Sequence, residues 1–479
     1  MSIFKLPNWA LPIAQSKWNT VVVWLLRAAV GCVFIFSGLV KGIDPWGGYY
    51  KLIDYFNAFG FPELVQVALP CALALACFEF VLGVCVLVGA FRRGSVALLL
   101  LMMCVMTPLT LDLALTGKVP DCGCFGDALV LSNWHTFVKN LILLPALVYL
   151  QCFNRRVHGL YGPAINWAVG LFALVYIAVV AYDGYNVQPL IDFRPYKVGA
   201  RVGVSSTADT DGDDYVFIYE KDGKQQAFGL DSLPDDDSGW QYVQRRFKPG
   251  REPRGQASHP TIEIHDNGND VTDLVLPDTG RQLLILFPDL KNVNIAYTFD
   301  INVISENAKK QGVAMMGLTA ADTAAVAEWY DISMARYPIY NVDESQLKTI
   351  ARGNPALVYV ENGAVRWKRT LTSLNPDYVR NEQFPIARYN SDYDASGQLK
   401  GLTGALVIAM LALLLINRTH VVVLAMCRRF RSQRSPRADA GLIPIRSAKL
   451  CGALKHEKHR GGLPCGWGRE APKEHWRIT

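Results

Sequence analysis

The chain has 479 residues, of which 51% are hydrophobic and 19% charged, and its formal net charge is +6. This length allows two or three domains, and the hydrophobic fraction is high for a soluble protein. The positive charge comes from the C-terminal end, where residues 418–479 hold 14 Lys and Arg against 4 Asp and Glu. The basic balance therefore gives no support to nucleic-acid binding by the rest of the chain.

Six apolar runs are long enough to cross a membrane, because about 20 helical residues span the hydrocarbon core. The first run lacks a small-residue cleavage site, so we do not expect it to be a removed signal peptide. The predicted spans are about 20–39, 66–90, 94–115, 134–152, 164–182 and 402–420.

The basic residues between the spans predict the orientation. Arg92-Arg93, Arg155-Arg156 and the arginines after the sixth span all fall on one side of a six-span chain. Cytoplasmic loops carry the excess of Lys and Arg, so both termini are expected in the cytoplasm. We expect a bacterial inner-membrane protein whose loop 117–133 and polar region 183–400 face the periplasm, where paired thiols persist as disulfides.

The polar region begins with a β-rich segment. Short runs such as 215–219 alternate with acidic turns such as 211–214 and 234–237. The turn at 211–214 faintly resembles a calcium loop, but its Asp spacing is wrong and the distal Glu is missing. A solvated turn is the favoured interpretation.

Strands and helices alternate in the next segment, which predicts an α/β layer. Pro355 opens a strand that a hairpin follows, and this resembles the second half of the thioredoxin fold, where that proline is cis. An active dithiol would then follow the strand 283–287, but residues 183–426 contain no Cys. We predict strands at 283–287, 312–318 and 355–360, a turn and a fourth strand within 361–367, and helices near 299–311 and 320–330.

The predicted organisation is therefore a membrane all-α four-helix bundle joined to further helices and an α/β thioredoxin-like extracytoplasmic domain. The tail is basic and without a sustained period, so it is expected to be disordered and attracted to anionic lipid. The boundaries are 1–160 for the four-helix transmembrane bundle, 161–185 for the fifth transmembrane helix, 186–280 for the β-rich segment, 281–398 for the degenerate thioredoxin-like domain, 400–426 for the sixth transmembrane helix and 427–479 for the cytoplasmic tail.

Cys122-Gly123-Cys124 is the motif that points most directly to chemistry. Two residues separated by one other lie about 5.5–7 Å apart, which overlaps the Cα separation of disulfides, and Gly123 permits the tight turn. So small a ring is expected to be strained and easily reduced, which suits thiol transfer better than a structural role. The alternatives are ordinary loop thiols or half of a metal site. No other Cys or His pair has ligand spacing, so no metal is predicted.

Cations near this pair would favour the reactive thiolate. His135 and Lys139 open the fourth span on the same side, and Lys118 precedes the pair. The alternative role for the lysines is snorkelling at the membrane interface. The predicted catalytic residues are Cys122, Cys124, His135 and Lys139.

Charges inside the spans are expected to have partners. Arg27 and Glu79 lie about 12 Å and 16 Å from the inner ends of their spans, which predicts a salt bridge between them. Asp112 and Lys139 likewise share the outer third of the membrane. Such pairs fix helix register or form a proton path, for which Arg27, Glu79 and Asp112 are the candidates.

The cysteines within the spans are expected to be small buried hydrophobes. Cys71 alone lies in the outer third, where it could act as a relay partner for the thiol pair. The residues concerned are Cys32, Cys71, Cys77, Cys85 and Cys104.

A family resemblance adds to these observations. The pattern Arg27, Gly31, 34–38, Lys41, 44–45, Glu79 and Gly83 resembles the DoxX-like membrane proteins. The run 121–126 followed by Asn133, Trp134 and Asn140 resembles the methylamine-utilisation MauE branch of that group. The resemblance covers about residues 18–152, and extended forms of this kind occur in Bacteroidetes. It implies a four-helix bundle like that of vitamin K epoxide reductase, a role in redox maturation or electron transfer, and quinone as a partner.

The leading hypothesis is a thiol–disulfide or electron relay between periplasmic protein thiols and the membrane quinone pool, with Cys122 and Cys124 as the redox pair. The Cys-free domain would hold a thiol-containing client protein. The alternative is a non-enzymatic envelope anchor whose extracytoplasmic domain binds a partner. A transporter is a weaker option, because the six spans show no symmetric halves. Membrane lipid is an expected partner, and nucleic acid is not.

Overall fold

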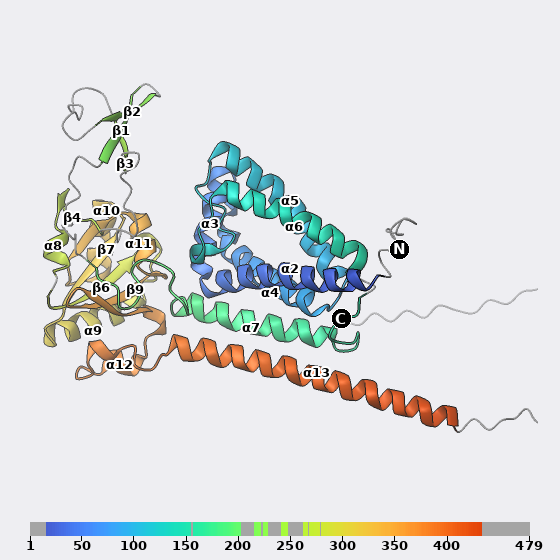
Figure 1. Cartoon of the computed structure of the whole chain (residues 1–479). Helices are drawn as coiled ribbons and strands as arrows, with labels where there is room; N and C mark the ends of the chain where they lie inside the picture. Colours follow the sequence, from blue (N-terminus) through green and yellow to red (C-terminus); the bar gives the residue numbers. More distant parts are fainter. Residues whose placement is uncertain are drawn as a thin grey trace, which may run out of the picture. The chain divides into compact units, whose positions relative to one another are not determined.

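The computed structural model describes residues 16–154, 157–202, 215–221, 224–228, 241–247, 262–266, 268–277 and 279–433 (Figure 1). Six of its helices are long and apolar enough to cross a membrane, which confirms the predicted spans. Their bounds are α2 Lys17–Ile43, α4 Ala68–Val88, α5 Gly94–Thr116, α6 Asn133–Phe153, α7 Asn166–Asn186 and α13 Ala395–Gln433.

Consecutive candidate spans alternate in direction, so segments 44–67 and 117–132 and the described residues between α7 and α13 follow the same ends of the helices. The first of these forms a helix that the apolar pattern did not predict, α3 (Pro45–Ala58). Asp44 ends α2 and accepts a hydrogen bond from the Gly47 amide, while Pro45 supplies a preorganised first turn. A short 3-10 helix, η1 (Pro62–Val67), then leads into α4.

Helices α2 and α4 pack with their backbones in contact at glycines. A Cβ atom on Gly38 would lie 2.4 Å from the Phe80 amide nitrogen, and one on Gly83 would lie 2.6 Å from the Ile35 nitrogen. Only glycine allows this approach, which is the way that membrane helices associate without a hydrophobic driving force between them. The glycine contacts fix which residues of α2 and α4 lie at the same depth.

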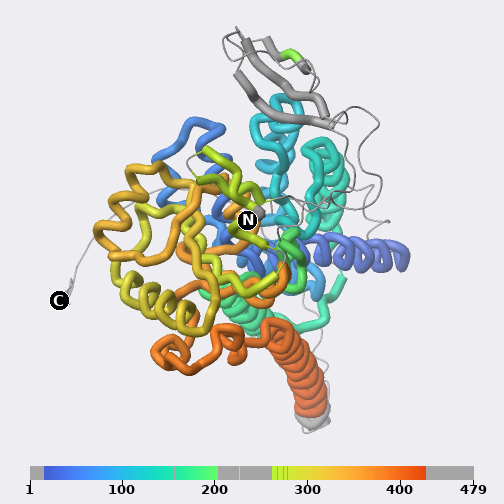
Figure 2. Tube along the Cα trace, turned by 90° about the vertical axis from the view of Figure 1, so that its left-hand side faces the viewer, coloured from blue at the N-terminus to red at the C-terminus, as the bar shows by residue number. Residues whose placement is uncertain are grey.

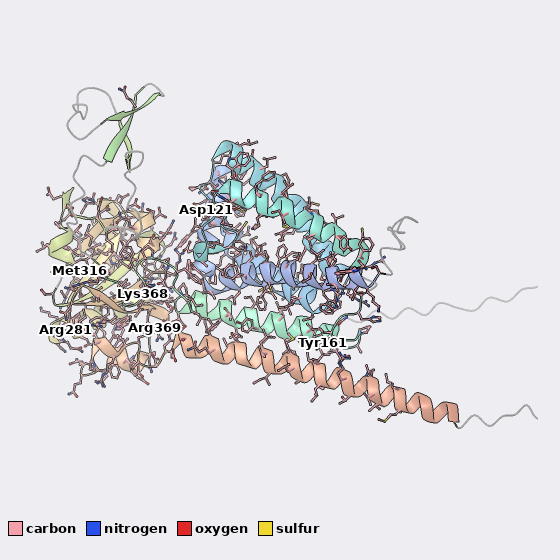
Figure 3. All side chains as sticks on the ribbon, in the orientation of Figure 1. Asp121, Tyr161, Arg281, Met316, Lys368 and Arg369 are labelled. Atoms are coloured by element: carbon pink, nitrogen blue, oxygen red, sulfur yellow. The ribbon has the colours of Figure 1, made fainter. Side chains whose placement is uncertain are left out.

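Helix α13 returns beside α7 (Figures 1 and 3). The Tyr161 hydroxyl, just before α7, donates to the Met410 carbonyl over 2.9 Å. The hydroxyls of Tyr176 and Thr403 are 3.0 Å apart, and the Gly162 amide donates to Asn417. These polar contacts occur among apolar side chains, where a hydrogen bond has little competition from water.

A seven-stranded mixed sheet with its covering helices makes up the mixed-sheet domain, residues 262–394 (yellow to orange in Figures 1 and 2). The strand order is β10-β9-β6-β7-β8-β4-β5, with β6, β7 and β8 parallel and β9 antiparallel to β6. The strands are β4 Ile264–Asp266, β5 Asn269–Asp270, β6 Arg281–Phe287, β7 Ala314–Thr319, β8 Ile339–Val342, β9 Ala356–Glu361 and β10 Ala364–Thr370.

The alternation of side chains along β6 gives the sheet two buried faces. Leu283, Ile285 and Phe287 pack against α9 and α10, whereas Leu284 and Leu286 pack against α8 and α11. A strand buried on both faces appears in sequence as a continuous apolar run, as predicted for 283–287. The helices are α8 Thr272–Val275, α9 Tyr297–Lys310, α10 Thr323–Ser333, α11 Glu344–Ile350 and α12 Pro376–Arg380.

The expected alternation of strands and helices is confirmed within one or two residues at most boundaries. The peptide bond Asn354–Pro355 is cis, as the resemblance to thioredoxin implied. Strand β8 was not predicted, because it is short and only partly buried.

The β-rich segment forms a separate three-stranded antiparallel sheet in the order β2-β1-β3. Its strands are β1 Tyr215–Lys221, β2 Lys224–Phe228 and β3 Gln241–Phe247. The acidic turns at 211–214 and 234–237 lie outside the described residues, as does the tail from residue 434.

The glycine contact between α2 and α4 leads to a stability prediction. Gly38→Ala places a methyl group against the Phe80 backbone, so the helices must separate, and we expect a loss of about 1–3 kcal/mol. Thermal unfolding of the full chain in detergent, followed by circular dichroism, measures the change. Gly404→Ala is the matched control, because nothing lies within 4 Å of a Cβ there. Equal unfolding temperatures for the two variants would contradict the proposed contact.

Candidate functional site

The cysteine pair lies in a short turn between α5 and α6, which we call the thiol turn, Asp121–Asp127. Gly123 adopts a positive φ of 65°, a conformation that L side chains rarely take, and its amide donates to the Asp121 carboxylate over 2.9 Å. Asp121 also pairs with Ser132 in an antiparallel bridge that closes the base of the loop (Figure 3 labels Asp121). Asp121 therefore orders the start of the turn through both contacts.

The two sulfur atoms face each other within this turn. They are 2.8 Å apart, beyond the 2.05 Å of a disulfide bond, and both cysteines are free thiols. Cys122 is buried with 6% of its surface exposed, and Cys124 is half-buried. A small closure of the turn would bring the sulfurs to bonding distance.

Side chains from α2 and α3 hold the backbone of the pair. The Tyr55 hydroxyl donates to the Cys122 carbonyl over 3.1 Å. Ser37 and Lys41 donate to the Cys124 carbonyl over 2.6 and 2.9 Å. The turn is thus bonded to the bundle at each cysteine.

The thiols form part of the wall of a cavity of about 370 Å³ inside the bundle. Most of the lining is apolar, and the polar groups gather near the sulfurs. This size and character are typical of sites that bind small organic molecules. The polar lining residues are Ser37, Lys41, Lys51, Glu79, Lys139 and Asn140, and the apolar lining includes Phe34, Leu52, Phe56, Met102, Met103, Met106, Leu109 and Leu143.

The pKa values of the two thiols are shifted in opposite directions. The hydrogen bond from Cys122 lowers the pKa of Cys124 to about 6, against the effect of burial and with help from Lys139 and Lys41. The same hydrogen bond, together with burial, raises the pKa of Cys122. Cys124 is therefore the thiolate near neutral pH and Cys122 the thiol that donates to it.

Of the predicted cations, Lys139 lies at the cavity. Its ammonium is 4.4 Å from the centre of the Phe125 ring, next to Cys124. His135 is exposed, and its Nδ1 atom is 2.6 Å from the Ser132 hydroxyl. Lys118 is 43% exposed and lies 3.8 Å from Asp112. A direct role for His135 in the thiol chemistry stays a prediction.

The predicted salt bridge between Arg27 and Glu79 is wrong. Arg27 donates to the Asn154 side chain over 2.6 Å and to backbone carbonyls at 157 and 158. Glu79 instead pairs with Lys41 over 2.6 Å, and its carboxylate lies 2.7 Å from the Ser37 hydroxyl oxygen. The glycine contacts explain the error, because they place Gly38 beside Phe80 and Arg27 beside Gly89, beyond the end of α4.

Two further expectations also need correction. Asp112 pairs with Lys118 rather than Lys139. Among the span cysteines only Cys85 is buried, while Cys32, Cys71 and Cys104 lie exposed on helix surfaces and Cys77 is half-buried. Surface positions on spans contact lipid, which accepts a thiol as readily as a protein core does.

Sequence reasoning assigned no role to Lys41, Ser37 or Tyr55, although two of them belong to the DoxX-like pattern. Lys41 and Ser37 are four residues apart, so they share one face of α2. This spacing was the available signal, but the partners of that face could not be read from the sequence. Tyr55 gave no signal, because α3 itself was not predicted.

Residues 19–153 match the family model described as Methylamine utilisation protein MauE. This MauE-matching segment comprises α2 to α6 and the whole thiol turn. A second family model, Domain of unknown function (DUF8463), matches residues 214–250, which include β1, β2 and β3. No curated protein and no solved structure matches the chain. Among the described residues, no group of three or more His, Cys, Asp or Glu could hold a metal ion.

The cations at the cavity give a prediction on thiol reactivity. With the protein reduced, the alkylation rate of Cys124 by iodoacetamide should be half-maximal near pH 6. Lys139→Gln removes a positive charge that stabilises the thiolate, so the midpoint should rise by about one pH unit. Mass spectrometry of the alkylated peptides gives the rate for each cysteine.

Lys118→Gln is the control, because this exposed lysine pairs with Asp112. Its alkylation midpoint should stay at the wild-type value. If Lys139→Gln also left the midpoint unchanged, Lys139 would not be a cation that favours the thiolate.

Proposed function

We propose that the protein is a membrane thiol–disulfide relay in which Cys122 and Cys124 pass electrons from a client protein to the membrane quinone pool. The observation that carries this proposal is the thiol pair in the wall of an apolar cavity within the bundle. An aqueous electron carrier would not favour such a cavity, whereas a lipid-soluble ring would.

The electron balance of the relay is simple. A client dithiol reduces the Cys122–Cys124 disulfide, so the client disulfide forms as the S–S bond of the pair breaks. Reoxidation of the pair forms that S–S bond again and releases two electrons and two protons, which reduce one quinone to a quinol. Cys124 is suited to be the nucleophile in the reoxidation step, because its thiolate is stabilised and it is the less buried of the two cysteines.

The residues around the cavity have distinct tasks in this scheme. Lys139 and Lys41 stabilise the thiolate, and the Lys41–Glu79 ion pair lines the cavity that the acceptor would occupy. The apolar walls exclude water from the reacting sulfurs. Quinone is thus the acceptor whose chemistry fits the residues present.

We further propose that the mixed-sheet domain is a thioredoxin-like domain that holds the client. The cis proline at the start of β9 and the antiparallel β9–β10 pair support this assignment. The turn after β6 has Pro288 and Asp289 where a redox-active relative would have a dithiol. The domain would therefore bind the client, and the thiol turn would perform the exchange.

The relay requires the thiol turn to face an oxidising compartment. The arginine-rich loops favour placing that side outside the cytoplasm, with both termini inside. On this orientation the protein is an inner-membrane protein and the mixed-sheet domain is periplasmic.

The second candidate function is an envelope anchor that binds a partner without redox chemistry. A hollow between η7 (Leu290–Asn292) and α10 supports it, because large apolar side chains are exposed around it. Exposed apolar surface of this kind often marks a protein interface. The exposed apolar residues that line the hollow are Ile295 and Ile332.

Redox trapping in cells distinguishes the two functions. Thiols are blocked with light N-ethylmaleimide, disulfides are reduced and labelled with the heavy reagent, and the tryptic peptide 119–139 reports both cysteines at once. In respiring cells the pair should be mostly oxidised, and quinone depletion should shift it toward the reduced form. A ratio that is the same with and without quinone would reject the relay and favour the anchor.

Serine variants provide the matched controls for the phenotype. Cys122→Ser and Cys124→Ser should each abolish oxidation of the client while the protein stays in the membrane. Cys71→Ser, at an exposed position at the start of α4, should behave as wild type.

A further inference from the structure

One side chain of the mixed-sheet domain contacts the thiol turn and the adjacent end of the membrane bundle. Arg352 lies between α11 and β9, two residues before the cis peptide bond, and only 6% of its side chain is exposed. A buried guanidinium requires partners for its five N–H groups, so its neighbours show what it holds together.

The first partner of Arg352 is the junction of α2 and α3. Its guanidinium forms three hydrogen bonds with the Asp44 carboxylate, at 2.7, 3.1 and 3.1 Å. Burial alone would raise the pKa of Asp44, but Arg352 and Arg194 hold it below its ordinary value. Asp44 also caps α3, the helix that carries Tyr55 to the thiol turn.

The second partner is the thiol turn itself. The Nη2 atom of Arg352 is 2.9 Å from the Asp127 carboxylate, three residues after Cys124. The same nitrogen contacts Asp44, so one guanidinium joins the turn to the start of α3. No other hydrogen bond or ion pair shown for the described residues joins the mixed-sheet domain to the thiol turn.

The Arg352 backbone is fixed from the bundle side as well. Gln188, just after α7, donates to its carbonyl over 2.6 Å and accepts from its amide over 3.1 Å. The Arg352 guanidinium also lies 5.4 Å from the centre of the Tyr50 ring of α3. The side chain therefore approaches the thiol turn from a rigid position.

We propose that Arg352 is a positioning residue for the thiol pair, which holds the turn closed over the cavity through Asp127 and so makes thiol reactivity depend on the docked mixed-sheet domain. Without this contact the Cys124 carbonyl keeps its bonds to Ser37 and Lys41, but the end of the turn at Asp127 loses its ion pair with Arg352. The Cys124 side chain would then shift relative to Lys139 and Cys122. The biological role of this positioning rests on the proposed function, whereas its test measures thiol reactivity alone.

The test compares alkylation of Cys124 with pH in reduced, full-length protein. The decisive variant is Asp127→Asn, because its two effects on Cys124 have opposite signs. Loss of a neighbouring negative charge would by itself favour the thiolate and lower the midpoint. Release of the turn would separate the thiolate from its cations and from Cys122, and would raise the midpoint.

We expect the effect of releasing the turn to exceed the effect of removing the negative charge of Asp127. The ratio of the alkylation rate at about pH 6 to the rate at about pH 9 should fall at least about fivefold in Asp127→Asn, because the thiolate fraction falls tenfold per pH unit below the midpoint. The ratio cancels changes in access to the sulfur. Arg352→Gln should show the same fall, and Arg352→Lys, which keeps the charge, should recover part of it.

Arg366→Gln is the matched control on the same domain, because Arg366 pairs with Glu361 while 52% exposed. Its rate ratio should equal that of wild type. A lowered midpoint or an unchanged ratio in Asp127→Asn would overturn the proposal, and Asp127→Asn decides the matter if Arg352→Gln fails to fold. If cellular trapping rejects the relay while the ratio falls as expected, the positioning role stands and the proposed function fails.

Discussion

The close approach of α2 and α4 at their glycines is the constraint on which the site depends. Backbone contact at Gly38 and Gly83 leaves these helices no freedom to slide, because a shift of one residue would place a side chain where only a hydrogen fits. Their relative depth is thereby set to within a fraction of a helical turn. Every polar pair between them follows from this register.

The register brings a cation, a carboxylate and a hydroxyl together beneath the thiol turn. Lys41, Glu79 and Ser37 bond to one another, and two of them also bond to the Cys124 carbonyl. A lone charge at this depth would be costly, so the cluster is stable only with all its members present. The low-dielectric surroundings that make an unpaired ion costly also strengthen the effect of the lysines on the Cys124 thiolate.

Sequence reasoning succeeded where the signal is local and failed where it depends on register. The first five spans follow from apolar length, and the strands β6 and β9 follow from runs of buried residues, so both were predicted within a few residues. Helix α13 extends well beyond the predicted span 402–420 at both ends. The partner of Glu79 depends on how two helices slide past each other, and a count of residues from estimated helix ends was not accurate enough. Helix α3 was missed because it is too short and too mixed in polarity to be taken for a span.

The thiol turn shows the same division at the level of chemistry. Its cysteines and glycine were evident, because one intervening residue limits their separation whatever the fold. The contact of Arg352 with Asp44 joins residues 308 positions apart, and no spacing rule connects them. Lys139 was predicted because it lies near the start of the span that follows the cysteines, so it is close to them in the sequence as well as in space.

The use of an ion pair rather than an apolar contact at Arg352 has a physical consequence. An apolar interface would be stable in any rotation that buries similar area, whereas a guanidinium shared by two carboxylates is satisfied in one geometry. Removing Asp44 from its buried pair with Arg352 costs about 3–5 kcal/mol, because the guanidinium is left without its main partner, whereas Asp127 is 38% exposed and contributes less. Docking at this point is therefore specific in position as well as stable. In the proposed positioning role, a domain that carries no thiols influences a thiol pair that it does not touch directly, through the contact of Arg352 with Asp127.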